Sequence, residues 1–304
     1  MSMQTPDEKG GFVTIFDDTY DQPDCRAYYR MQRRLGYSIH AHAVPIYRAV
    51  LAELVRLRGL APGAPRILDF ASSYGIVSAL MKHEVSVAEF YDHYADPALD
   101  ALDPAGMVAA DRDWLRSLPL REPRARYAGL DVSENAVAYG RAVGLFEEAF
   151  AEDLQQHAPS AALSAWLART DLIVECGSVA HLMPDALDRV LSAARDNRPW
   201  IVVSPVRGNE RAEAFAVMAD HGLVVETLGL PPVPHRHFEG RAEQMRAIAI
   251  ARAAGHETDG FESTGAFFAQ IQLARPADEL TDPATWPSPP PWPAEHATNP
   301  PMKD

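Results

Sequence analysis

Acidic residues follow short apolar runs at several places in the chain, where a sheet protein would present them to a ligand. The first is Arg66–Gly75, RILDFASSYG, in which Asp69 is followed by small residues and Gly75 precedes a helical pattern. A strand, a tight turn and a helix N-terminus in ten residues form the usual phosphate- or nucleotide-binding arrangement of α/β sheets. The candidate ligand-binding residues of this segment are Asp69, Ala71, Ser72, Ser73, Tyr74 and Gly75.

A second acid, Asp131, ends the apolar run of residues 126–131 and is followed by Val132 and by Ser133, a plausible helix N-cap. A carboxylate beside the first turn can accept both hydroxyls of a ribose. Asp92 and Asp96 compete for this role because they lie nearer to the turn in sequence. Both fall in a helical pattern, so Asp131 is favoured.

Two more segments end in the same way. Residues 150–154, FAEDL, place Asp153 and Leu154 after a short strand, and residues 171–182, DLIVECGSVAHL, place Glu175, Cys176, Ser178 and His181 after another. Open parallel sheets bind ligands beyond the carboxyl ends of their strands, so these side chains are expected near the first turn. His181 can take a proton from a reacting group, although a lone histidine there more often has a structural hydrogen bond.

Strands and helices alternate along residues 62–276, which predicts an α/β fold. Further strands are expected at residues 200–205, 223–228 and 267–273, and the last two follow each other without a full core helix between them. The prediction is a doubly wound, mostly parallel, seven-stranded Rossmann-like sheet with an antiparallel last strand, plus a helical N-terminal cap.

The ordered set of motifs resembles class I S-adenosylmethionine (SAM) dependent methyltransferases. The family's three alternate glycines correspond to Ala71, Ser73 and Gly75, so only one is present. Alanine or serine costs on the order of 1 kcal/mol or more where φ must be positive, and fits readily where φ stays negative. The resemblance implies a Rossmann-like fold and SAM as the cofactor.

The resemblance also implies roles for single residues. Asp131 with Val132 would bind the ribose, Asp153 would accept the adenine amino group, and the Leu154 amide would meet the ring. Glu175 and Cys176, at a strand end that would face both the methyl donor and the acceptor, would contact the cofactor. The candidate catalytic residues are His181, Glu175 and Tyr20; the tyrosine is placed there by location, since an aromatic face attracts a sulfonium.

The implied activity is transfer of the SAM methyl group to an unidentified small-molecule acceptor. Two alternatives stay open. A SAM-consuming enzyme of the same fold would cyclise SAM to a small cyclic amino acid and methylthioadenosine, and a noncatalytic SAM-binding partner protein would fit the altered glycine turn.

The flanks are expected to determine the acceptor. We expect an N-terminal helical cap at residues 1–61, a SAM-binding domain at 62–276 with helical insertions at 84–125 and 231–265, and a Pro-rich tail at 277–304, disordered or draped over the surface. Tyrosine and histidine side chains of the cap are available to close over the strand ends: Tyr28, Tyr29, Tyr37, His40 and His42. In the second insertion His235 and His237 have no third ligand nearby, so no metal site is predicted and a hydrogen bond to an acidic substrate is preferred.

Composition narrows the class of protein. The chain has 304 residues, a formal net charge of -14 and two cysteines, which disfavours a duplex nucleic-acid partner and a disulfide framework. Apolar runs are strand-sized and no charged, then hydrophobic, leader is seen, so we expect a cytoplasmic protein with no membrane span. A small-molecule substrate and a possible homodimer complete the expectation.

Overall fold

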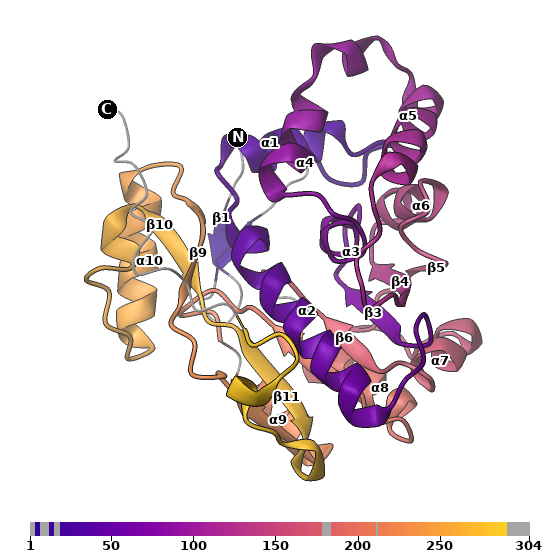
Figure 1. The fold of residues 1–304 in the computed structure, drawn as a ribbon. Helices are drawn as coiled ribbons and strands as arrows, with labels where there is room; N and C mark the ends of the chain where they lie inside the picture. The colour runs from indigo at the N-terminus through magenta and orange to yellow at the C-terminus, as the bar shows by residue number, and fades with distance from the viewer. Residues whose placement is uncertain (1–3, 7–11, 15–18, 178–183, 211, 291–304) are drawn as a thin grey trace.

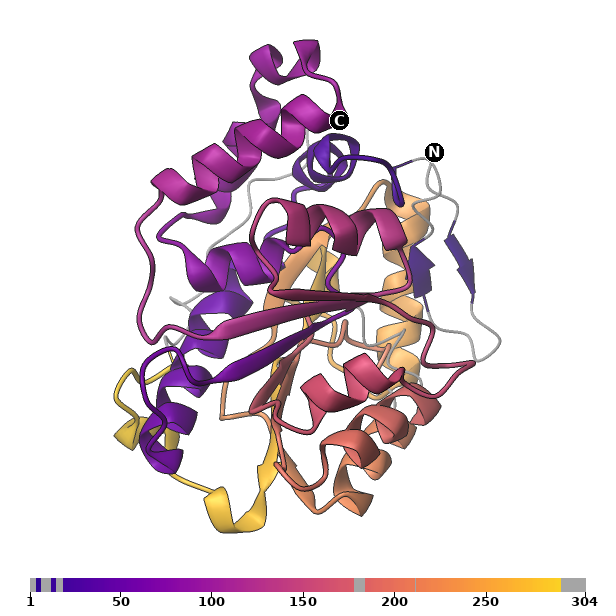
Figure 2. The same ribbon diagram turned by 90° about the vertical axis from the view of Figure 1, so that its right-hand side faces the viewer.

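The structure is a computed structural model that describes residues 4–6, 12–14, 19–177, 184–210 and 212–290. Its centre is a seven-stranded sheet with the order β5-β4-β3-β6-β7-β11-β8, seen almost edge-on in Figure 2. The strands of this sheet are β3 (Arg66–Phe70), β4 (Arg126–Asp131), β5 (Glu148–Ala151), β6 (Leu172–Val174), β7 (Trp200–Val203), β8 (Leu223–Glu226) and β11 (Gln272–Pro276).

The pairing confirms the predicted fold class. β3 to β7 pair in parallel, whereas β11 runs antiparallel to both β7 and β8. The chain therefore has a mostly parallel Rossmann-like sheet with one reversed strand. The strand predicted at residues 267–273 is divided in two: β10 (Ala266–Ala269) leaves the sheet to pair with β9 (Val233–His237), and only β11 enters the sheet.

Two layers of helices cover the sheet because its side chains alternate between faces. Ile67 packs in one apolar cluster and the next residue, Leu68, in the other. The helices of the first face are α1 (Arg26–Arg34), α2 (Ile39–Arg58), α3 (Ile76–Lys82), α4 (Val87–Ala95), α5 (Pro104–Ser117) and α6 (Glu134–Ala142). Those of the second face are α7 (Ala161–Leu167), α8 (Pro184–Ala194) and α9 (Ala212–Asp220).

The remaining elements lie outside these layers. β1 (Gln4–Pro6) and β2 (Phe12–Thr14) form a short antiparallel pair within the region expected to be a helical cap. The insertion between β8 and β11 contains β9, α10 (Arg241–Ala253) and β10, which Figure 1 shows as a separate group in orange beside the sheet. In the described part of the chain, no helix combines the length and apolarity that crossing a bilayer needs.

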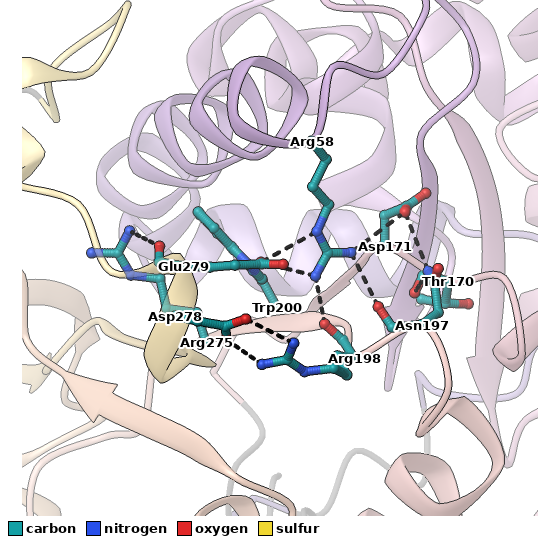
Figure 3. A network of polar contacts seen from close by, with 9 residues as sticks. All are labelled: Arg58, Thr170, Asp171, Asn197, Arg198, Trp200, Arg275, Asp278 and Glu279. Atoms are coloured by element: carbon teal, nitrogen blue, oxygen red, sulfur yellow. Dashed lines mark hydrogen bonds and ion pairs between the residues drawn. The ribbon is translucent and has the colours of Figure 1, made fainter.

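Polar contacts fasten the chain at the amino ends of β6 and β7 (Figure 3). The Arg58 guanidinium, at the end of α2, donates to Glu279 at 3.0 Å and to the carbonyl of Arg198 at 2.7 Å. Asp171, just before β6, accepts from the backbone of Arg66 and from Asn197. This edge is opposite to the carboxyl ends, so its interactions serve to hold α2 to the sheet.

The same network holds part of the segment expected to be a disordered or draped tail. Glu279 also accepts a hydrogen bond from the indole of Trp200, and Trp286 is buried with its own indole donating to Thr281. Residues 277–290 thus pack against the domain, and the rest of the predicted tail lies outside the described residues.

Asp111 joins the N-terminal cap to the first insertion. Its carboxylate is fully buried and accepts hydrogen bonds from Tyr94 (2.8 Å), Tyr139 (2.5 Å) and the imidazole of His93 (2.8 Å). The thiol of Cys25, which precedes α1, lies 3.7 Å away. One side chain of α5 therefore connects α4, α6 and the start of α1.

Replacing this carboxylate by an amide is expected to destabilise the protein. In Asp111→Asn one half of the side chain becomes a donor that faces other donors, so the free energy of unfolding should fall by about 2 to 4 kcal/mol. Urea unfolding measures this. Asp113→Asn, an exposed position on the same helix, should change it by less than about 0.5 kcal/mol; equal effects at the two positions would contradict the structural role of Asp111.

Candidate functional site

The turn between β3 and α3 has an unusual backbone. Ala71, Ser73 and Gly75 have φ values of 55°, 50° and 90°. Alternate residues are therefore left-handed, although two of them carry a Cβ, and the turn does not keep the negative φ that would suit alanine and serine. Each such residue costs roughly 1 to 2 kcal/mol. Gly75 is constrained by packing as well, because a Cβ there would lie 2.9 Å from the Phe146 ring.

Asp131 holds this turn from the neighbouring strand. One carboxylate oxygen, Oδ2, accepts from the backbone N–H of Ser73 at 2.9 Å and from the hydroxyl of Tyr20 at 2.7 Å. The other, Oδ1, accepts from the backbone N–H of Ser133 at 3.0 Å. A carboxylate has about four acceptor positions, so one remains on Oδ1. Asp92 instead pairs with Arg33, and Asp96 caps a short helix at Ala98.

The segment before α1 lies across these two strand ends. After Tyr20, the carboxylate of Asp21 accepts a hydrogen bond from the Ser133 hydroxyl at 2.7 Å. The backbone carbonyl of Asp21 accepts one from the side-chain amide of Asn135 at 2.9 Å. The backbone N–H of Gln22 donates to the Tyr74 hydroxyl at 2.8 Å, and that hydroxyl donates to the Gln22 carbonyl. We refer to residues 20–22 as the strap. Burial and the nearby Asp131 raise the pKa of Tyr20, so its hydroxyl stays a neutral donor.

Asp69 lies beneath the turn and is buried. Its Oδ2 accepts from the hydroxyl of Ser78 at 2.7 Å and from the same residue's backbone N–H at 3.2 Å. Burial raises the pKa of Asp69 to about 7, against the lowering by Ser78, and the charges of Asp131 and Glu175 add to the rise. Asp69 is therefore an acid that titrates near neutrality inside the site.

The strand end of β6 brings a third acid to the same edge. Glu175 is fully buried, and its carbonyl accepts from the Tyr47 hydroxyl at 2.6 Å. Burial, with the charge of Glu175, raises the pKa of Cys176, which keeps this thiol protonated. The backbone N–H of Gly177 donates to Ser204 at 3.0 Å. The predicted residues Ser178 and His181 lie outside the described part of the chain.

The remaining predicted contacts flank Asp131. Val132 has 69% of its surface exposed, the largest fraction among the exposed large hydrophobic residues of the described segments. Asp153 follows β5 with an exposed side chain and accepts from the backbone N–H of Gln155 at 2.9 Å, while Leu154 is buried. Among described residues, no group of three His, Cys, Asp or Glu side chains is arranged to hold a metal ion.

The structure thus brings Asp69, the turn, Asp131 and Glu175 to one edge, and adds residues that sequence patterns did not single out. Asp21 and Gln22 of the strap carried only a turn signal. Their contacts are to residues more than fifty positions away. Such pairings have no local pattern in the sequence.

No family model matches the chain, and no curated protein matches it. Among solved structures, magnesium protoporphyrin IX methyltransferase from Synechocystis PCC 6803 with bound SAM is 13% identical with a TM-score of 0.39, over 82% of this chain and 91% of that one. A TehB-like SAM-dependent methyltransferase from Corynebacterium glutamicum is 14% identical with a TM-score of 0.34, over 73% and 87%.

Precorrin-6y C5,15-methyltransferase from Geobacter metallireducens is 14% identical with a TM-score of 0.34, over 76% of this chain and 87% of that one. At such identities and scores, the interpretation of the site rests on the geometry of this chain alone.

The raised pKa of Asp69 predicts a pH dependence of stability. A carboxyl that keeps its proton in the folded protein favours folding below its ordinary pKa of 3.8, and this contribution is lost as the pH rises through 7. The difference in the free energy of unfolding, wild type minus Asp69→Asn, should therefore decrease as the pH is raised from 4 to 8. The expected decrease is on the order of 2 to 4 kcal/mol.

Guanidinium unfolding of both proteins at several pH values measures this difference. Asp92→Asn, which removes an exposed acid, serves as the control and should show no comparable trend. A difference between wild type and Asp69→Asn that stays constant or grows with pH would contradict the raised pKa.

Proposed function

We propose that the protein is a SAM-dependent methyltransferase acting on a small-molecule acceptor. The observation that supports this most directly is the carboxylate of Asp131 at the end of β4, hydrogen-bonded to the turn after β3. Adjacent strand ends of a doubly wound sheet, one carrying a tight turn and the other an acid, are suited to a nucleoside.

The positions of the other residues are consistent with this ligand. An adenine ring over the exposed Val132 would cover an apolar side chain that is otherwise open to water. Asp153 and the amide of Leu154, past the end of β5, would meet the polar edge of the ring. The methionine part would extend over the 71–75 turn toward Glu175, where an acceptor could reach the methyl group.

SAM would supply the electrophile, a methyl group on a positively charged sulfur. The protein would align the acceptor with that carbon and keep water out. The acids Asp69, Asp131 and Glu175 would attract a ligand that carries ammonium and sulfonium charges. Tyr20 and Tyr28, whose ring centroids are 5.5 Å apart, would add aromatic surface beside the site, where a sulfonium is attracted to ring faces.

Calorimetric titration with SAM and with S-adenosylhomocysteine (SAH) tests the cofactor. Asp131→Asn should weaken SAH binding by about 10- to 100-fold, since hydrogen bonds to a charged group are worth about 1.5 to 3 kcal/mol. Asp92→Asn should bind as wild type does. Absence of binding to wild type, or equal affinity for Asp131→Asn, would contradict the proposal.

Mass spectrometry of SAM incubated with the protein alone completes that experiment. Intact SAM is expected without an acceptor. Release of methylthioadenosine would instead indicate cyclisation, and SAM binding without turnover on any acceptor would indicate a noncatalytic binding protein.

The Tyr20 hydroxyl predicts a second effect on binding. It occupies Oδ2 of Asp131, and one remaining acceptor position on Oδ1 is too few for two ribose hydroxyls. Tyr20→Phe removes this competitor while keeping the ring, so the affinity for SAH should rise by about 2- to 10-fold. Tyr127→Phe, at a buried tyrosine of β4, the strand that ends in Asp131, should have no effect on SAH affinity. Weaker binding by Tyr20→Phe would mean that the hydroxyl helps to hold the nucleoside.

A further inference from the structure

The insertion and the N-terminal cap form a joint wall beyond the carboxyl ends of the strands. β8 ends and β11 begins at that edge, so the ribbon of β9 and β10 between them extends past it. The start of α2 attaches to this ribbon, because the backbone N–H of Ser38 donates to the carbonyl of His235 at 2.8 Å. The N–H of His237 donates to the carbonyl of Leu35 at 3.0 Å.

His235 points from this wall to the end of β6. It is buried, and its Nε2 would lie 2.6 Å from a Cβ placed on Gly177, two residues beyond Glu175. Its Nδ1 is buried and has no hydrogen-bond partner among the described residues. A buried ring nitrogen without a partner has lost the hydrogen bond that it would make with water in the unfolded chain. Binding of a ligand that forms a hydrogen bond with this nitrogen is therefore favoured.

A second imidazole lies close by. His40, in the first turn of α2, is buried with its Nδ1 3.3 Å from the hydroxyl of Tyr91. The ring of Tyr37 neighbours both histidines, with centroids 6.5 Å from His40 and 5.2 Å from His235. His235 therefore faces the strand end where the acceptor is expected, and His40 lies near it beside the shared ring of Tyr37.

Aromatic rings also lie beside Asp131, at the cofactor end of the proposed site. Tyr28 is 5.5 Å from the ring of Tyr20, which donates to Asp131. Burial raises the pKa of Tyr28, so its hydroxyl stays uncharged. We refer to Tyr20 and Tyr28, beside Asp131, and Tyr37, beside the imidazoles, as the aromatic lining.

The charges around this lining select against an anionic acceptor. Asp69, Asp131 and Glu175 are acids of the same edge, and burial keeps the imidazoles uncharged, lowering the pKa of His235 to about 3 and of His40 to about 4. The neighbouring cation, Arg236, is buried and paired with Glu243 at 2.6 Å, and its charge, after burial, also lowers the pKa of His235. An acidic substrate, which the sequence favoured for His235, would therefore find repulsion here.

An ammonium acceptor is also disfavoured. It is not a nucleophile until it loses a proton, and the two buried imidazoles are weak bases for that step. A hydroxyl needs no prior deprotonation to offer a lone pair. Its aromatic form fits the tyrosine lining.

We propose that His235, with His40 beside it, binds the hydroxyl of an uncharged phenolic acceptor, so that the protein is an O-methyltransferase; this rests on the proposed function. The hydroxyl oxygen uses a lone pair to form the new C–O bond while the C–S bond breaks and leaves its electron pair on sulfur. The protonated ether then gives its proton to Nδ1 of His235, which passes it to solvent. Such a cation is far more acidic than an imidazolium, so a weak base suffices.

The test uses three probes that share a ring and differ in charge: phenol, benzoate and benzylammonium. Each is titrated into SAH-loaded protein at pH 7.5 and followed by saturation-transfer NMR. Phenol should bind with millimolar affinity. Each charged probe would have to bury its charge beside uncharged imidazoles and aromatic rings, so it should bind at least about five-fold more weakly. His235→Ala should reduce phenol binding by about five- to ten-fold and leave the SAH affinity within two-fold.

Two further variants separate recognition from folding. In His235→Asn an amide reaches the Nδ1 position and should restore most of the phenol affinity. His221, which follows the end of α9, pairs with Asp188 of α8. His221→Ala should have no effect on phenol binding. An unchanged SAH affinity reports that each variant is folded.

The outcomes are distinguishable. If SAH does not bind wild type, the proposed function fails. If SAH binds, the acceptor proposal is overturned by any of three results: phenol does not bind, a charged probe binds best, or His235→Ala binds phenol as wild type does.

Discussion

The hydrogen bonds of the Asp131 carboxylate join three parts of the chain that lie far apart in sequence. The carboxylate ends β4, receives the backbone of Ser73 from the turn after β3, and receives the hydroxyl of Tyr20 from the strap. Without it, the left-handed backbone of the turn would lack its cross-strand support and the strap would lose its first attachment. The acid suited to a nucleoside is therefore also the acid that shapes the site around it.

This arrangement depends on a cap that is held firmly at its other end. Asp111 ties the residue before α1 to three other helices, and Arg58 ties the end of α2 to the amino edge of the sheet. Tyr20 lies just before the first anchor and donates to Asp131, and Tyr28 packs against its ring. His40 lies between the anchors, beside the hydroxyl of Tyr91. Rigid supports on both sides allow the cap to present side chains to a ligand at low cost in conformational entropy.

Local patterns predicted most of the sheet and the acids at its edge. Asp69, Asp131 and Glu175 each end an apolar run, and such runs form strands whose carboxyl ends meet. The division of residues 267–273 was missed because an apolar run does not reveal where a strand changes its partner. Asp21 with Ser133 and His40 with His235 were also missed as pairs, since each is formed only when distant segments pack together.

The turn after β3 keeps a left-handed backbone at three alternate residues, of which only Gly75 is a glycine. Ala71 and Ser73 adopt positive φ values although negative values would be less costly. The cost is offset because the N–H of Ser72 donates to Leu130, that of Ser73 to Asp131 and that of Gly75 back to Ser72. Three hydrogen bonds from backbone N–H groups, two to carbonyls and one to the Asp131 carboxylate, thus fix a conformation that glycine adopts at little cost. The Cβ atoms of Ala71 and Ser73 therefore add to the surface of the turn while its backbone keeps the path that glycines would also adopt.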